Sequence, residues 1–138
     1  MIILDTNVIS EPLRPRPDPR VLSWLNQQKR ELLFVTVTNL AELKMGIAIL
    51  PSGKKKATLQ LGVVRVLKDY FGPRILNVTE GIADLHAAIF AEARRKGVAI
   101  GFADAQIAAI AKSRGFVVAT RDVKPFDAAG VEVVDPWK

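Results

Sequence analysis

The chain opens with MIILDTNVISE, residues 1–11, and this stretch decides how the rest of the sequence is interpreted. Residues 2–4 form a short apolar run that ends abruptly at Asp5. An unbroken apolar run of this kind is typical of a strand buried on both faces of a parallel sheet. We therefore place Asp5 at the carboxyl end of a central strand, the edge at which open α/β sheets bind ligands. Taken alone, Asp5 is at least as typical of a helix N-cap, so the other segments have to decide between a cap and a site.

The composition is that of a folded protein. Of the 138 residues 49% are apolar, which excludes a largely disordered chain, and the length suits a single domain over residues 1–138. No apolar run could cross a bilayer and the N-terminus lacks a signal-peptide pattern, so we expect a cytoplasmic protein. The absence of cysteine excludes thiolate catalysis and Cys-ligated zinc. The single histidine, His86, argues against a Ser-His-Asp triad or a multi-histidine metal site.

The charge balance is basic. Twenty lysines and arginines face fourteen acidic residues, a net charge of +6, and the isoelectric point is near 9.9. An excess of positive charge favours a polyanionic partner such as nucleic acid. Residues 54–56 and the two arginines before residue 17 are expected in mobile loops, although a lysine run can also be merely solvated. The candidate nucleic-acid contacts are Arg14, Arg16, Lys54, Lys55, Lys56 and Arg121.

Apolar, β-branched runs alternate with segments of helical periodicity along the chain. The predicted strands cover residues 2–4, 32–37, 75–78, 116–119 and 131–134. Strands that alternate with helices imply a parallel sheet with right-handed crossovers. The sequence therefore predicts an α/β fold, a three-layer α/β/α sandwich with a central, mainly parallel five-stranded sheet.

Capping and turn residues give the helix boundaries. The prolines of residues 11–19 indicate a loop, after which Pro19 can open a helix. Asn39 and Glu42 fit the spacing of a capping box at the start of the next helix. The helix over residues 57–71 carries two apolar lines, which indicates either a second subunit packed against it or a well-buried helix. Further helices are expected after Thr79, after Asp104 and over residues 126–129.

Four acidic residues fall at the same edge of this predicted sheet. Asp5 and Asp122 follow strands, while Glu42 and Asp104 lie in the first turns of helices that begin there. Each acid alone also suits a turn or a helix N-terminus. Carboxylates that converge repel one another, so they need raised pKa values or bound cations. Oxygen ligands of this kind select Mg²⁺ or Mn²⁺, and such an ion can activate water and stabilise the leaving oxygen of a phosphodiester.

The segments around these acids resemble the motifs of PIN-domain nucleases, in the family's order and over essentially the whole chain. They are LDTNVIS at 4–10, AEL at 41–43, ADA at 103–105 followed by IA at 107–108, and TRD at 120–122. Three further segments are similar to the FitB-like branch of the VapC-type toxins: SEPLRP at 10–15, GKKK at 53–56 and PW at 136–137. Gly101 and Phe102 depart from the family's usual lead-in to the third motif, which leaves the shape of that loop open.

The resemblance implies a Mg²⁺-dependent (or Mn²⁺-dependent) endoribonuclease, the toxin of a type II toxin–antitoxin system, held inactive by a small DNA-binding antitoxin. It also implies an RNA substrate, a homodimer and a toxin–antitoxin hetero-oligomer in which an antitoxin arginine can lie among the carboxylates. Asp5 and Asp104 would be direct metal ligands. The residues that carry over by position are the catalytic and metal-binding acids Asp5, Glu42, Asp104 and Asp122, supported by Asn7 and Thr120.

Other interpretations use part of the pattern. A phosphatase of the haloacid dehalogenase type needs a second Asp where this chain has Asn7, and a receiver domain places its phosphoryl-accepting Asp after a later strand. A dinucleotide-binding fold needs a Gly-rich turn after the first strand, which residues 6–8 do not provide. The remaining alternative is a non-catalytic PIN-like module that binds nucleic acid or regulates a DNA-binding partner. Four mutually repelling carboxylates argue against it.

Overall fold

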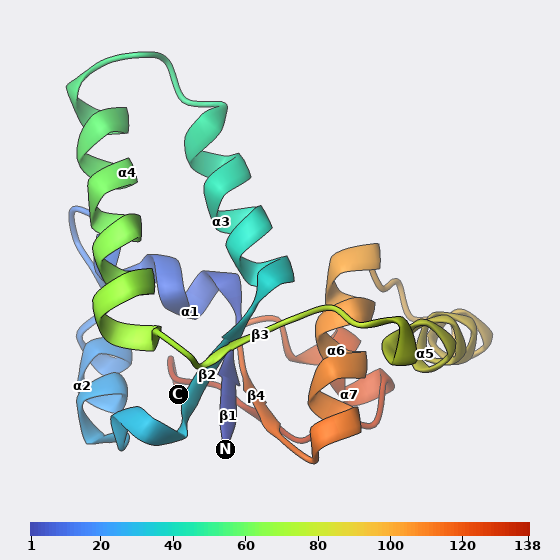
Figure 1. Ribbon diagram of the computed structural model, residues 1–138. Helices are drawn as coiled ribbons and strands as arrows, with labels where there is room; N and C mark the ends of the chain where they lie inside the picture. Colours follow the sequence, from blue (N-terminus) through green and yellow to red (C-terminus); the bar gives the residue numbers. More distant parts are fainter.

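The computed structural model describes all of residues 1–138, and its centre is a five-stranded sheet in which every neighbouring pair is parallel (Figure 1). The spatial order is β3-β2-β1-β4-β5, so the opening strand lies in the middle, as predicted. Its Ile2 is in register with Leu33 on one side and Val117 on the other. The strands are β1 (Ile2–Leu4), β2 (Leu33–Thr36), β3 (Ile75–Leu76), β4 (Val117–Ala119) and β5 (Val133–Val134).

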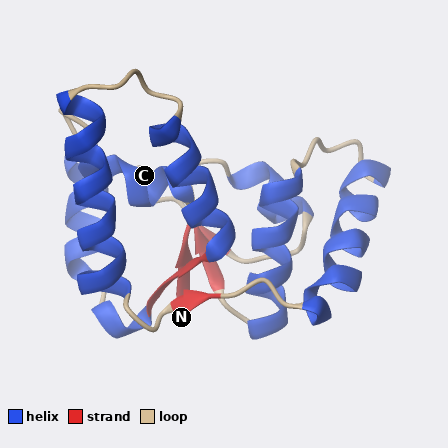
Figure 2. Ribbon diagram, turned by 45° about the horizontal axis from the view of Figure 1, so that its top comes forward, coloured by secondary structure: helices blue, strands red, loops and turns tan.

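Helices connect the strands and cover both faces of the sheet (Figure 2). No helix is long and apolar enough to cross a membrane. The α-helices are α1 (Thr6–Ser10), α2 (Pro19–Gln27), α3 (Val37–Ala48), α4 (Lys54–Arg65), α5 (Ala83–Arg95), α6 (Phe102–Arg114) and α7 (Val123–Ala128). Short turns of other helix types are the 3₁₀ segments η1 (Glu11–Leu13), η2 (Arg30–Leu32) and η4 (Glu80–Ile82), and the π-helical η3 (Val66–Phe71).

Two hydrophobic cores lie on opposite faces of the sheet. Alternate side chains of a strand point to opposite faces, and Ile3 accordingly joins the core beneath α5, α6 and α7, whereas Leu4 joins the core beneath α1 to α4. Val118 and Ala119 of the neighbouring strand divide in the same way. The predicted three-layer sandwich is therefore confirmed.

Asp5 is an N-cap as well as a candidate site residue, and the predicted loop over residues 11–19 is partly helical. Residues 6–10 form helix α1, because the Asp5 side chain caps it and accepts the Thr6 backbone N–H at 2.8 Å. Residues 11–13 continue as η1, where Pro12 occupies an early position that needs no N–H donor. Only the stretch between η1 and α2 is irregular.

The start of α3 was predicted two to three residues too late. Its N-cap is Thr36, not Asn39, and the capping box joins these two residues: the Thr36 hydroxyl accepts the Asn39 backbone N–H at 3.1 Å, and Asn39 Oδ1 accepts the Thr36 N–H at 3.0 Å. Thr36 takes this role because its backbone is still extended, as a cap requires. Glu42 consequently lies in the second turn of α3 instead of the first.

The lysine run also differs from its expected place in a mobile loop. Residues 54–56 form the first turn of α4. Lys56 Nζ donates hydrogen bonds to the carbonyl oxygens of Ala48 and Leu50, at 2.8 and 3.3 Å. It thereby satisfies free carbonyl groups at the carboxyl end of α3, which is a structural role.

The central strand should be the least tolerant of truncation. Ile3 is fully buried, so Ile3→Ala should lower the free energy of unfolding by about 2–5 kcal/mol. Ile49, which is 79% exposed, provides the control, and Ile49→Ala should change it by less than about 0.5 kcal/mol. Urea unfolding followed by circular dichroism measures both. Equal losses would contradict the assignment of β1 to the centre of the fold.

Candidate active site

Asp5 is the anchor of the candidate site. It follows β1 at the carboxyl edge of the sheet, and only 5% of its surface is exposed. Its Oδ2 accepts hydrogen bonds from Thr120 Oγ1 at 2.7 Å and from Asn7 Nδ2 at 3.0 Å, while Oδ1 accepts the Thr6 N–H. Oδ1 also accepts a longer hydrogen bond from Asn39 Nδ2 at 3.4 Å, so each oxygen of the carboxylate has two donors.

The two predicted supporting residues lie where they can hold Asp5. Asn7 reaches it from α1, and Thr120 reaches it from the end of β4, the strand paired with β1. Asn7 Nδ2 also donates to Thr120 Oγ1 at 3.1 Å, and this hydroxyl in turn accepts the Asp122 backbone N–H at 3.0 Å. Both side chains therefore orient the loop that carries Asp122.

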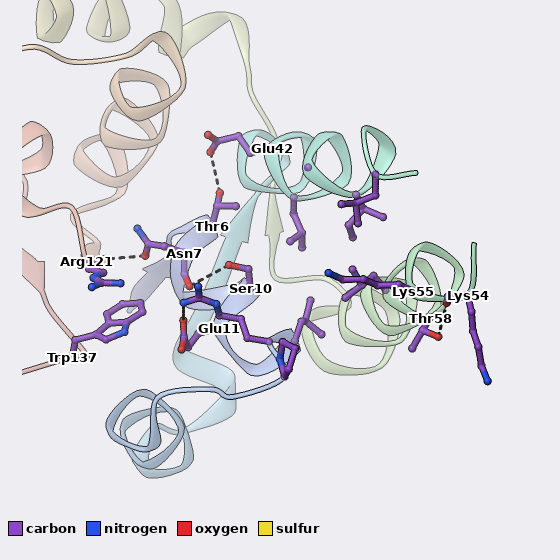
Figure 3. A pocket seen from close by; sticks show the side chains of 18 residues that line it. Thr6, Asn7, Ser10, Glu11, Glu42, Lys54, Lys55, Thr58, Arg121 and Trp137 are labelled. Carbon is purple, nitrogen blue, oxygen red and sulfur yellow. Dashed lines mark hydrogen bonds and ion pairs between the residues drawn. The ribbon is translucent and has the colours of Figure 1, made fainter. Parts of the chain in front are cut away.

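A second set of polar contacts links Asp5 to α3, and it involves residues that sequence reasoning had assigned only to caps. Buried Asn39 directs its amide nitrogen towards Asp5 Oδ1 and Thr6 Oγ1, both at 3.4 Å. The Thr6 hydroxyl donates to Glu42 Oε1 at 2.9 Å (Figure 3). The burial of Asn39 in the structure accounts for these contacts, because a fully buried amide needs hydrogen-bond partners for its donors.

Asp104 lies in the first turn of α6, as predicted, and Asp122 precedes α7. α6 is tied to α3 by a hydrogen bond from the Thr38 hydroxyl to Gln106 Oε1 at 2.6 Å, a contact that the sequence did not reveal. It links the helix that carries Asp104 to the helix that carries Glu42. The Asp104 carboxylate is half-buried and receives no hydrogen bond that would offset its desolvation.

The electrostatics show that the four acids share one neighbourhood. Burial, together with the charges of Asp5, Glu42 and Asp122, raises the pKa of Asp104 to about 6. Burial also raises the pKa of Asp5 and of Glu42, against the hydrogen bonds that they accept. None of the four forms an ion pair with a lysine or arginine. The cluster is thus a concentration of negative charge without an internal counter-ion.

The donor set fits a hard divalent cation that retains water. No three acidic or histidine side chains lie close enough to hold a metal ion among them. Mg²⁺ is usually held by one or two carboxylates together with waters and substrate phosphates, so it does not need such an enclosure. The Asp104 carboxylate accepts no hydrogen bond and has the most capacity for direct contact, whereas the second bond to Asp5 Oδ1, from Asn39, is long at 3.4 Å.

A cavity of about 940 Å³ opens beside the acids, between α1 and the α3–α4 hairpin (Figure 3). Thr6, Asn7 and Glu42 lie at its acidic end. Of the six predicted nucleic-acid contacts, the structure brings four to this cavity and leaves Arg16 and Lys56 outside its lining. The four are Arg14, Lys54, Lys55 and Arg121.

The family model for the PIN domain matches residues 2–131 of this chain. Three relatives match over full length. The plasmid stability protein StbB of Pseudomonas syringae pv. tomato is 44% identical over 138 residues, covering 100% of this chain and 99% of the relative. The toxin FitB of Neisseria gonorrhoeae is 44% identical over 137 residues, covering 99% of each chain. The VapC ribonuclease Y4jK of Sinorhizobium fredii is 40% identical over 138 residues, covering 100% and 99%.

The chain therefore belongs to the PIN-domain family, and within it to the FitB-like branch of the VapC toxins. Solved structures agree. The crystal structure of FitAcB from Neisseria gonorrhoeae superposes with a TM-score of 0.93 at 44% identity, over 99% of both chains. The structure of FitAB bound to an IR36 DNA fragment superposes with a TM-score of 0.94 at 43% identity, over 100% of this chain and 96% of that one.

The raised pKa of Asp104 leads to a prediction for the metal-free protein. Between the ordinary pKa of 3.8 and about 6 the folded state binds more protons than the unfolded state, so this group's contribution to stability falls as the pH rises through that window. Asp104→Asn removes the penalty and should stabilise the protein at pH 7 by roughly 1 kcal/mol, or about 3 °C in melting temperature, because half-exposure screens the effect.

The gain in melting temperature should shrink as the pH is lowered from 7 towards 4. Thermal unfolding in a chelator measures it, with Asp127→Asn, an exposed carboxylate on α7, as the control. If the Asp104→Asn variant melts below the wild type at pH 7, the prediction is wrong, and the Asp104 carboxylate stabilises the fold instead of destabilising it.

Proposed function

We propose that this protein is a divalent-metal-dependent endoribonuclease and the toxin of a toxin–antitoxin pair. The observation that carries the proposal is the cluster of Asp5, Glu42, Asp104 and Asp122, which lacks any basic partner in the chain. Carboxylates that repel one another and have no counter-ion in the chain are stabilised in their charged form by a cation bound from solution. The VapC ribonuclease name of one full-length relative supports RNA as the substrate.

Asp5 and Asp104 would hold a Mg²⁺ or Mn²⁺ ion directly, with Glu42 and Asp122 acting directly or through water. The ion, when bound, supplies an activated water and charge stabilisation for a phosphodiester. The hydrogen bonds from Thr120, Thr6 and Asn7 lower the pKa of Asp5 against the effect of burial, so they help to keep this carboxylate charged. The Thr6 hydroxyl does the same for Glu42 while it fixes one of its oxygens.

Substitutions at Asp5 and Thr120 should separate a metal-contacting group from a supporting one. Asp5→Asn should lower RNA cleavage by more than about 100-fold, since loss of an outer-shell partner typically costs about 10–100-fold. Thr120→Val, which removes only the hydroxyl that donates to Asp5, should fall in the outer-shell range. Cleavage of a labelled single-stranded RNA in Mg²⁺ measures both, and Asp127→Asn is the matched control.

Isothermal calorimetry with Mn²⁺ distinguishes this proposal from the alternative of a non-catalytic nucleic-acid-binding or regulatory module. The nuclease should bind the ion, and Asp5→Asn should weaken that binding together with activity. Full RNA cleavage by Asp5→Asn in a chelator would refute the metal-dependent mechanism. RNA binding without metal binding or cleavage would favour the module.

The partner proposal concerns a small DNA-binding antitoxin. The FitAB–DNA structure supports an antitoxin complex, and an antitoxin arginine could supply the positive charge that the four acids lack. Exposed Leu61 and Val64 on α4 offer an apolar face for a second copy, which supports a homodimer with two antitoxin chains.

The arginine and the divalent ion should then exclude each other. The affinity of the cognate antitoxin should weaken as Mg²⁺ rises at constant ionic strength, in step with occupancy of the acids. Fluorescence titration measures it, with Na⁺ as the control salt, and sedimentation of the complex reports its stoichiometry. An affinity that is insensitive to Mg²⁺ would mean that the antitoxin leaves the acids free.

A further inference from the structure

Two segments that mark the branch have no part in the acidic site, yet both end at its cavity. Residues 10–15 form the end of α1, η1 and the start of the following loop, and Pro136–Trp137 lies after β5, just before Lys138. Glu11, Arg14 and Trp137 all line the cavity beside the acids. Each segment positions one arginine at the cavity: residues 10–15 hold Arg14, and Trp137 holds Arg121.

Arg14 is held by a buried carboxylate. Glu11 is only 4% exposed, its Oε2 lies 3.2 Å from Arg14 Nη1, and its Oε1 accepts the Asp18 backbone N–H at 2.8 Å. Because both oxygens are engaged, the carboxylate cannot swing away from Arg14. A guanidinium has five N–H donors and Glu11 takes one of them, so the exposed remainder is free to bind an anion.

Arg121 is held by an aromatic ring. Its guanidinium carbon lies 5.6 Å from the centre of the Trp137 ring, a cation–π contact, and its backbone N–H donates to Asn7 Oδ1 at 3.3 Å. Trp137 is itself buried, and its backbone N–H donates to Asp135 Oδ1 at 3.0 Å. Figure 3 shows Arg121, Trp137 and Glu11 on the same side of the cavity. Arg121 forms no ion pair with the neighbouring acids.

We propose that Arg14 and Arg121 are two preorganised phosphate ligands, which seat a single strand of RNA with its backbone beside the acidic cluster. The inference rests on the proposed ribonuclease function and adds to it the residues that bind substrate. A guanidinium fork matches two phosphate oxygens, and a fork held in place loses little freedom on binding. Four basic side chains against two acidic ones in the lining, Glu11 and Glu42, give the cavity the charge that a polyanion requires.

The size of the cavity favours one strand. Its volume of about 940 Å³ is at the upper end of the range of roughly 300–1,000 Å³ for small-ligand sites, which suits a short single-stranded segment. Lys54 and Lys55 lie on the far side of the cavity from Arg121 in Figure 3. Arg121, whose backbone N–H donates to Asn7, lies at the acidic end of the cavity, so basic side chains at both ends give the strand a path along the groove.

The test measures RNA affinity without cleavage. Wild-type protein in a chelator is titrated into a fluorescein-labelled single-stranded RNA at several salt concentrations, and log K is plotted against log [salt]. Arg14→Gln and Arg121→Gln should each flatten the slope by about 0.7, the value for one lost phosphate contact on a single strand. The matched control is Arg114→Gln, which makes the same charge change at the opposite end of α6 and should leave the slope unchanged.

Three further variants test the supports and the shape of the guanidinium. Glu11→Gln and Trp137→Leu should weaken RNA binding at low salt although they remove no positive charge, and Arg14→Lys should restore the slope while binding less tightly than wild type. Thermal unfolding shows which variants are folded. If Trp137→Leu is not folded, the slope of Arg121→Gln alone decides whether Arg121 contacts phosphate.

The outcomes separate this inference from the proposed function. Wild-type binding with unchanged slopes in both arginine variants overturns the inference and leaves the nuclease proposal standing. No binding of RNA by the wild type overturns both. If the arginine variants lose affinity for a Glu-rich peptide and keep their affinity for RNA, the two arginines serve a protein partner, and the inference is wrong.

Discussion

The structure depends on a buried carboxylate that must be kept charged. Asp5 ends the central strand, where an ionised side chain without partners would cost several kcal/mol. Donors from Thr6, Asn7 and Thr120 meet this requirement. The need for them explains why α1 begins immediately after Asp5 and why β4 lies beside β1: the pairing of Leu4 with Ala119 brings Thr120 next to the carboxylate. The hydrogen bonds that stabilise the fold and those that shape the site are therefore the same.

Negative charge is concentrated at the acidic cluster around Asp5, and positive charge lies on the arginines of the neighbouring cavity. Four acids share the carboxyl edge of the sheet without a basic partner, whereas Arg14 and Arg121 are held a short way off by Glu11 and Trp137. If these arginines lay among the acids, they would neutralise the cluster and leave no use for a cation. Their separate supports keep both charges available, one for a divalent ion and one for phosphate.

Asp5, Asp104 and Asp122 lie where the sequence placed them, because parallel strands all end at one edge of the sheet. Glu42 lies one turn further along α3 than predicted, because Thr36 caps that helix. Helix boundaries were less predictable. Asn39 is a residue type that often forms an N-cap. Thr36 caps α3 instead, because its backbone is still extended. Likewise Lys56 looks like part of a solvated basic run, yet it reaches the carbonyl groups at the end of α3. Local composition does not distinguish these cases because the choice depends on how α3 leaves the sheet.

The sequence by itself determined the alternation of strands and helices, and from it the parallel sheet and the acids at its carboxyl edge, because hydrophobic periodicity and turn residues are properties of short segments. Only the tertiary structure decided which donors reach Asp5, since Thr120 lies 115 residues away and meets it through strand register. It also decided that Arg14 and Arg121 line the same cavity. Such contacts arise when distant segments pack together, and packing depends on side-chain shape and register throughout the chain, which no local pattern records.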